Sequence, residues 1–206
     1  MITVSGLIQI VGYGSLLLEE SARKSVPNLT GFRIVRVPNY IRIFNKVGVV
    51  FHTRRQIEPA DVRRASCASR LREGAEIICS TFKCPAEEWP ELFEREHRFR
   101  WIEVEFIEVD GSIGKGQMCT EWTDEGYRAT RIKDDQDYFE RVGQHYQGKL
   151  WRDDILPFPE YLQLCLRAAG SHGEELVDHF LRSSYLADGE TTLEHYLKNN
   201  PNALTP

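Results

Sequence analysis

The first segment whose residue types could do chemistry is Gly12-Tyr13-Gly14-Ser15-Leu16. It follows a mostly apolar, β-branched stretch from Thr3 to Val11, which predicts a buried strand running into a glycine-rich loop. Two glycines let the backbone turn sharply and direct its N–H groups at one point, where a carboxylate or an oxyanion would bind. A glycine pair after a strand is more often a plain turn, so both interpretations stay open.

Two familiar loop chemistries do not fit this segment. It has neither the Gly-x-x-x-x-Gly-Lys pattern nor a complete Gly-x-Gly-x-x-Gly pattern, which argues against a nucleotide-binding loop. Ser15 is not in a Gly-x-Ser-x-Gly context, so a serine hydrolase has little support. We expect Ser15 to donate a hydrogen bond.

Glu96 is the second candidate for chemistry. On a helix, Leu92 and Phe93 lie four and three residues before it, so Glu96 shares the face that should turn inward. A carboxylate held against apolar neighbours loses solvation and becomes suited to carrying a proton near neutral pH. The spacing therefore favours Glu96 as a general acid and base.

The same helix also has an ordinary structural interpretation. Three acidic-to-basic pairs at i, i+4 are typical of a solvated helix: Glu91 with Arg95, Glu94 with Arg98 and Glu96 with Arg100. The pattern alone leaves a structural role for Glu96 open.

Other residues give weaker indications. Neither the six histidines nor the five scattered cysteines have metal-ligand spacing, so we expect no metal, no cofactor and reduced thiols. Tyr13 or Trp101 could form the wall of a small-ligand pocket. Four arginines could pair with a substrate carboxylate, and the sequence does not choose among them: Arg33, Arg42, Arg70 and Arg98.

The elements that must position these residues are mainly strands in the first two thirds of the chain and helices in the last third. Strands are expected at Thr3–Val11, Gly31–Val37, Tyr40–Phe44, Gly48–His52, Ala75–Phe82, Trp101–Val109 and Gln117–Trp122, with a long loop over Arg54–Arg72. Helices are expected at Pro90–Arg98, Pro159–Ala168, Gly173–Ser183 and Leu193–Lys198, the last with a capping box from Thr191 to Glu194. Short connections between the strands suggest a closed or half-closed, mainly antiparallel β-barrel with flanking helices, in the α+β class.

Composition and charge limit the classes of binding partner that we expect. The 206 residues carry a formal net charge of -5 without a basic block, so nucleic acid is not an expected partner. There is no basic N-terminal region and no apolar run long enough to span a membrane, which predicts a soluble, cytoplasmic protein that does not bind membranes. The oligomeric state is not determined by the sequence, and a homodimer stays open.

Several of these segments together resemble the γ-glutamylcyclotransferase superfamily, including its ChaC-like and AIG2-like branches. Val11 to Leu16 is similar to the family's Tyr-Gly-Ser loop, and Pro27 to Arg33 is similar to the entry into its second strand. Leu92-Phe93-Glu94-Arg95-Glu96 is similar to a motif whose last glutamate is the general acid and base. Phe93 stands where the family usually has aspartate, and His97 where it often has glycine.

The resemblance implies a fold, a reaction and a site. We expect residues 1–150 to form a γ-glutamylcyclotransferase-like barrel domain and residues 151–206 to form a C-terminal helical extension packed on it. The implied activity is cleavage of a γ-glutamyl amide by the substrate's own α-amino group, giving 5-oxoproline and a free amine or amino acid. Glu96 is then catalytic, and Tyr13, Gly14, Ser15 and Leu16 bind the γ-glutamyl substrate.

Three alternatives remain at this stage. The enzyme could be specific for glutathione or for γ-glutamylamines, since the departures from the family motif leave the leaving group open. The chain could be a non-catalytic module of the same fold that binds a small metabolite or a partner. Last, it could be an unrelated β-rich domain with chance motif matches.

Overall fold

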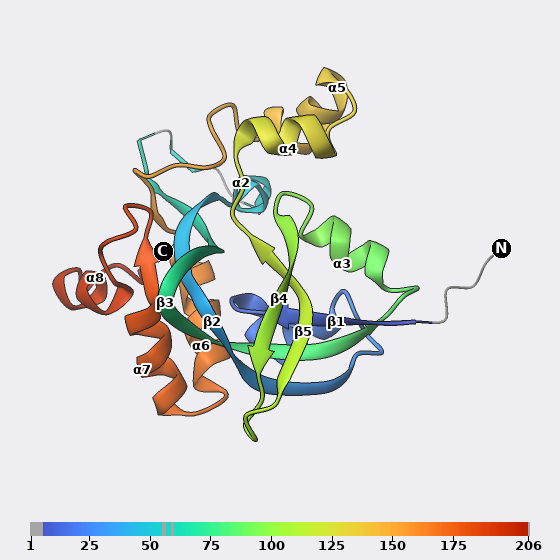
Figure 1. Cartoon of the computed structure of the whole chain (residues 1–206). Coiled ribbons are helices and arrows are strands. Elements are labelled where there is room, and N and C mark those ends of the chain that lie inside the picture. The colour runs from blue at the N-terminus through green and yellow to red at the C-terminus, as the bar shows by residue number, and fades with distance from the viewer. Residues whose placement is uncertain (1–5, 55–56, 59, 206) are drawn as a thin grey trace.

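Five strands form a closed barrel. They are β1 (Leu7–Gly12), β2 (Thr30–Val47), β3 (Arg63–Pro85), β4 (Arg100–Ile107) and β5 (Ile113–Thr120). The order β3-β1-β5-β4-β2 is closed by pairing of β2 with β3, as can be followed in the computed structural model in Figure 1. The structure describes residues 6–54, 57–58 and 60–205, so the part of the first predicted strand before residue 6 lies outside it.

Antiparallel pairs dominate the sheet. β1 and β2 both run antiparallel to β3, and β4 runs antiparallel to β2 and β5, whereas β1 and β5 are parallel. Two short strands, β6 (Leu156–Pro157) and β7 (Ser184–Leu186), add in parallel to β3 and β2. The predicted α+β, mainly antiparallel barrel is confirmed, with one parallel pair inside it.

The longest strand pair contains bulges that the sequence interpretation divided into separate elements. β2 joins the predicted strands Gly31–Val37 and Tyr40–Phe44, because the break at Pro38 is a register shift and not a turn. Another shift lies between Ile43 and Lys46, where three steps along β2 match two along β3. Such an inserted residue turns the following side chains to a different face of the sheet.

Two sequence predictions in this region are wrong. The segment Gly48–His52 is not a strand but the start of helix α2 (Val49–Arg54), in which Phe51 stacks on Phe158 at 4.3 Å between ring centroids. This tertiary contact overrides the β-branched propensity of the two valines. The predicted loop Arg54–Arg72 is strand from Arg63 onward, because the small side chains from Ala65 to Ser69 fit inside the barrel.

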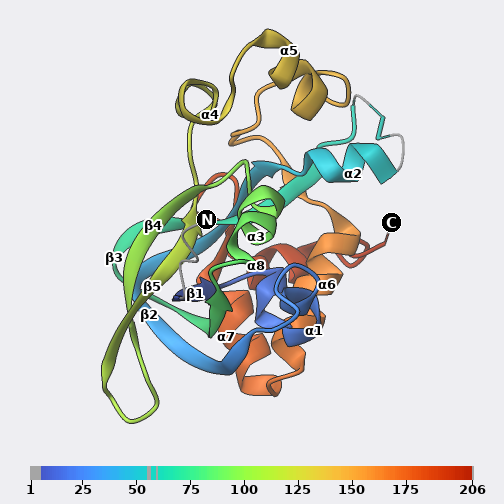
Figure 2. The ribbon, with the colours of Figure 1, turned by 90° about the vertical axis from the view of Figure 1, so that its right-hand side faces the viewer.

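Helices flank the barrel (Figure 1), and the side formed by β4 and β5 is left uncovered by the described helices in Figure 2. Those before residue 150 are η1 (Ser15–Leu17), α1 (Glu19–Arg23), α2, α3 (Trp89–Arg95), α4 (Asp124–Arg131), α5 (Asp135–Tyr138) and η2 (Phe139–Gly143). The expected helix Pro90–Arg98 is shorter than predicted, so Glu96 lies just after its end. In the described residues, no helix has both the length and the apolar character needed to cross a membrane.

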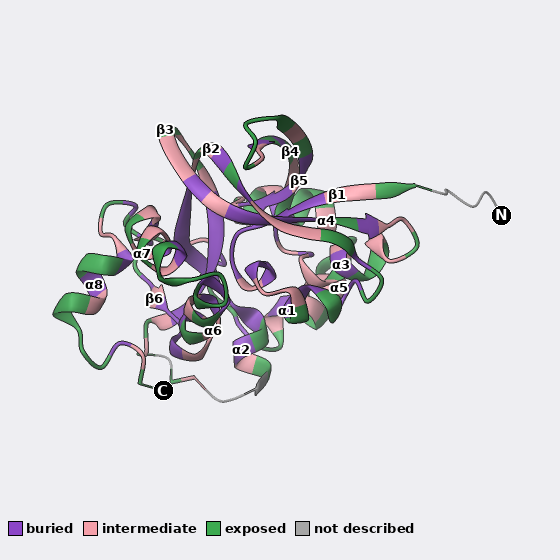
Figure 3. Cartoon of the chain, turned by 90° about the horizontal axis from the view of Figure 1, so that it is seen from below, coloured by how far each residue is buried: buried purple, intermediate pink, exposed green. Residues whose placement is uncertain are grey.

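Three helices form the C-terminal part, as predicted: α6 (Pro159–Gly170), α7 (Glu174–Ser183) and α8 (Leu193–Asn199). Their buried faces join the barrel's hydrophobic core, while the outer faces, above all of α8, are exposed in Figure 3. The helix cap differs by one residue from the prediction: Thr192 accepts from the backbone N–H of His195, whereas Thr191 donates to Asp188. The division of the chain at residue 150 stays a prediction.

Candidate active site

A cavity of about 390 Å³ opens between the end of β1, helix α2, the segment after α3, and α6. Both predicted site segments line it: Tyr13, Gly14, Ser15 and Leu16 from the loop, and Glu96 from the segment after α3. The structure thus brings together two regions that are about eighty residues apart in the sequence. The volume is in the range of small-molecule sites.

The loop after β1 is compact because Gly12 has no side chain. A Cβ atom at this position would lie 2.5 Å from Leu16 Cβ and 2.9 Å from Ser80 Oγ, which is too close for any other residue. The hydroxyl of Ser80 donates to Leu16 O at 2.7 Å and so holds the far end of the loop. The first glycine of the motif is therefore required by packing.

A fully buried arginine fixes the middle of the same loop. The guanidinium of Arg42 donates to Tyr13 O at 2.6 Å, to Ser183 Oγ at 2.9 Å and to Ile78 O, and it lies over the ring of Phe180. The hydrogen bonds connect β2, the loop, β3 and the end of α7. Arg42 was one of the arginines considered for a substrate carboxylate, but in the structure it positions the loop backbone.

Glu96 lies at the cavity with its side chain 16% exposed. Its carboxylate is 3.2 Å from Arg95 Nε, and the guanidinium of Arg95 also donates to Ser15 Oγ at 3.2 Å and to Ser21 O at 2.6 Å. Arg95 therefore links the acid directly to the glycine loop. In contrast, Glu94 is 61% exposed and pairs with Arg141 outside the cavity.

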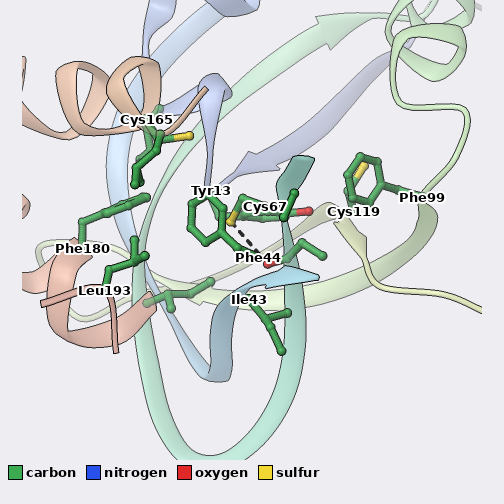
Figure 4. Packing of buried hydrophobic residues seen from close by; sticks show 14 of the residues in the cluster. Tyr13, Ile43, Phe44, Cys67, Phe99, Cys119, Cys165, Phe180 and Leu193 are labelled. Atoms are coloured by element: carbon green, nitrogen blue, oxygen red, sulfur yellow. Dashed lines mark hydrogen bonds between the residues drawn. The ribbon is translucent and has the colours of Figure 1, made fainter. Parts of the chain in front are cut away.

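Tyr13, Cys67 and Cys119 are buried in the same wall, and Figure 4 shows Tyr13 next to Cys67 and Phe99 next to Cys119. Burial raises the pKa of the Tyr13 hydroxyl well above its ordinary value, and it does the same for both thiols. These groups consequently stay protonated at neutral pH. Neither thiol has the thiolate character that a nucleophile needs.

Lys46 and Ser66 line the cavity and were missed by the sequence interpretation. They pair across β2 and β3 directly after the bulge, and Lys46 Nζ donates to Ser66 Oγ at 3.2 Å. The ammonium also lies 4.4 Å from the centroid of the Phe99 ring. The only sequence signal was a lysine inside the apolar stretch from Ile41 to Val50.

The C-terminal helices contribute to the site as well. Tyr161 and Leu164, both on α6, line the cavity, and a Cβ on Gly14 would lie 3.0 Å from Tyr161 Oη. Sequence reasoning placed this helix outside the site. No local pattern could have revealed that α6 packs against the glycine loop.

The other candidates are dispersed. Arg33 pairs with Glu108, Arg70 pairs with Glu121 at 2.7 Å, and Trp101 packs on Trp89 at 4.8 Å, all outside the cavity lining. Within the described ranges no group of three His, Cys, Asp or Glu residues could hold a metal ion. All five cysteines are free and buried.

Comparison with known proteins gives matches only among solved structures. No family model matches the chain, and no curated protein matches it. A human structure described as uncharacterized protein loc79017 is 15% identical, with a TM-score of 0.57 over 84% of this chain and 86% of the other. A gamma-glutamyl cyclotransferase is 15% identical, with a TM-score of 0.47 over 70% of this chain and 94% of the other. A glutathione-specific gamma-glutamyl cyclotransferase from yeast is 13% identical, with a TM-score of 0.47 over 84% of this chain and 94% of the other.

These likenesses concern the fold. At a TM-score of 0.57, the chain shares the fold of the human protein. Identities of 15% or less do not extend to the reaction.

Proposed function

We propose that this protein is a γ-glutamylcyclotransferase, which cleaves a γ-glutamyl amide by intramolecular aminolysis to give 5-oxoproline and a free amine or amino acid. The observation that carries the proposal is that Glu96 and the loop from Tyr13 to Leu16 line one cavity. Fold similarity raises the expectation but does not define the chemistry.

The reaction needs shape and proton transfer more than a protein nucleophile. The substrate's α-amino nitrogen attacks its own γ-carbonyl carbon, the new C–N bond closes a five-membered ring, and the amide bond to the leaving nitrogen breaks. No water is consumed. Because both reacting groups belong to one molecule, the cavity mainly has to hold the glutamyl chain in a folded conformation.

Proton balance defines the role of Glu96. The α-ammonium group carries three protons and the ring nitrogen of 5-oxoproline carries one, so two protons must reach the leaving nitrogen. A single carboxylate can take each proton from the attacking nitrogen and deliver it to the departing one. The contact with Arg95 holds the Glu96 carboxylate beside the loop, which suits this exchange.

Substrate binding falls to the loop. In this proposal the backbone N–H groups of Gly14, Ser15 and Leu16 hold the carboxylate or the developing oxyanion of the γ-glutamyl group, and Tyr13 forms a wall of the pocket. The hydrogen bond from Arg42 to Tyr13 O keeps the loop in one conformation before substrate arrives. This preorganisation lowers the cost of ordering the substrate.

The test compares Glu96→Gln with Glu94→Gln. Purified proteins are incubated with glutathione, γ-glutamyl dipeptides and γ-glutamylamines, and 5-oxoproline is measured. E96Q keeps the shape but cannot exchange protons, so its turnover should fall at least ~10²-fold. E94Q is the matched control, since Glu94 lies on α3 outside the cavity and should stay within about twofold of the parent, as expected for an exposed position.

Thermal unfolding of both variants should match the parent, which separates lost chemistry from lost folding. An E96Q protein that still makes 5-oxoproline at the parent rate would remove Glu96 from the mechanism. If the parent makes no 5-oxoproline from any of these substrates, the activity itself is wrong and a binding module of the same fold is the better interpretation.

A further inference from the structure

Positive charge exceeds negative charge around the cavity. Among the described residues that line it, the basic side chains are Lys46, Arg95 and Arg98, while Glu96 is the only acidic one. Arg95 is already paired with Glu96 and bonded to Ser15. Two cations are therefore left without a carboxylate partner within the cavity.

Lys46 is held in place by neutral groups. The residue is 6% exposed, and Nζ donates to Ser66 Oγ at 3.2 Å and to Val47 O at 3.4 Å. The Ser66 hydroxyl donates back to Lys46 O at 3.0 Å. In the part of the chain that the structure describes, no carboxylate forms an ion pair with Lys46. A buried ammonium without an anion is costly.

The guanidinium of Arg98 also lacks a partner for part of its hydrogen-bonding capacity. Its NH2 group donates to Arg141 O, but its buried Nε has no hydrogen-bond partner among the described residues. Burial lowers the pKa of this guanidinium below its ordinary value. Within the described lining both cations therefore lack an anion, and a ligand carboxylate in the cavity would supply one.

The electrostatic state of Lys46 agrees with this picture. Burial and then the nearby charge of Arg98 lower the pKa of Lys46 to about 7, against an opposing effect of Glu96. The titratable groups that face it are thus Arg98 and Glu96, after α3, and Cys119 on β5. A ligand carboxylate between the two cations would favour the charged lysine and restore its proton.

We propose that Lys46 and Arg98 form an anion subsite that binds a carboxylate on the leaving group of the substrate. This rests on the proposed function, in which the loop from Tyr13 to Leu16 already holds the γ-glutamyl part. The preferred substrates are then γ-glutamyl amino acids or peptides, which carry a carboxylate beyond the scissile amide. A γ-glutamylamine brings no second carboxylate and leaves both cations without an anion.

Two matched ligands test the subsite: γ-glutamylalanine and γ-glutamylethylamine, whose leaving groups differ by one carboxylate. Their affinities are measured by calorimetry on the E96Q protein, which binds without turnover. We expect E96Q to bind γ-glutamylalanine at least tenfold more tightly, in the range of about 10- to 100-fold that one charge-assisted contact gives. Introducing Lys46→Met into the E96Q protein should remove most of this preference.

Controls separate the subsite from general damage. Lys83→Met makes the same change at an exposed lysine of β3 and should leave the preference intact. Methionine has a length similar to that of lysine and removes a buried charge, so K46M is expected to fold. Arg98→Met is an independent second variant that should reduce the preference in the same direction.

The outcomes distinguish the two proposals. A protein that makes no 5-oxoproline but keeps the K46M-sensitive preference would refute the proposed function and retain the subsite. An active enzyme in which K46M weakens both ligands equally would refute the subsite. The subsite is also overturned if neither ligand binds to E96Q, or if E96Q does not prefer the ligand with the carboxylate.

Discussion

The strongest test of how the site is positioned is the replacement Arg42→Met. Arg42 is completely buried and gives hydrogen bonds to Tyr13 O, Ile78 O and Ser183 Oγ. Each hydrogen bond from a charged donor contributes about 1.5–3 kcal/mol. Burial opposes them, since removing a guanidinium from water costs several kcal/mol, and it also lowers the pKa of Arg42. We therefore expect R42M to reduce the free energy of unfolding by about 3 kcal/mol.

Urea unfolding measures this loss, with Arg36→Met as the matched control. Arg36 lies on the same strand, is 53% exposed and forms a long ion pair of 3.7 Å with Glu76, so R36M should change stability by less than about 0.5 kcal/mol. R42M should also lower the rate of 5-oxoproline formation, because the carbonyl oxygen of Tyr13 is no longer fixed. If R42M loses less than about 1 kcal/mol at an unchanged urea slope, the three bonds do not hold the loop as argued.

Two further predictions concern packing and pH. Gly12→Ala should destabilise the protein by about 1–3 kcal/mol, because the new Cβ would clash with Leu16 and Ser80. Gly170→Ala is the control, since the nearest atom to its Cβ would be 3.7 Å away, and it should not destabilise the protein. Thermal unfolding of the two variants measures the difference. Burial and nearby arginines hold the pKa of His97 at about 4, below the 6.5 of an unfolded histidine. The unfolded chain consequently takes up the proton first, so stability should fall as the pH drops from about 6.5 toward 4, and His97→Gln should flatten this slope in urea titrations. An equal slope in H97Q would contradict the assignment.

The glycine loop and Glu96 could be selected as candidates from the sequence because their signals are local. Gly12 and Gly14 follow an apolar stretch, and the spacing from Leu92 to Glu96 predicted a shared helical face, so short windows were enough to select them, although α3 ends at Arg95 and Glu96 lies just after it. Sequence alone could not show that the two segments line one cavity. That proximity depends on the barrel, in which β1 pairs with β3 and β5.

The residues that were missed depend on long-range geometry. Lys46 reaches the cavity through the register shift after Ile43, and a shift of one residue changes the face of every side chain that follows. Helix α2 forms where two valines favoured a strand, since Phe51 gains its stacking contact only when Phe158 is in place. Tyr161 comes to the loop from a helix almost 150 residues later in the chain.

The two proposals together divide substrate recognition between different parts of the fold. The loop and Glu96 would handle the γ-glutamyl group, which every candidate substrate shares, whereas Lys46 and Arg98 would contact the leaving group, in which the candidates differ. Lys46 and Ser66 are supplied by the end of the long β2–β3 pair, after the bulge, and the acid is supplied by the segment after α3. A substitution at Lys46 can consequently change which amide is chosen while the acid and its Arg95 contact remain in place. Selectivity and proton transfer should therefore respond to different mutations, because a selectivity change alters the difference between two ligands and a loss of the acid lowers turnover for all of them.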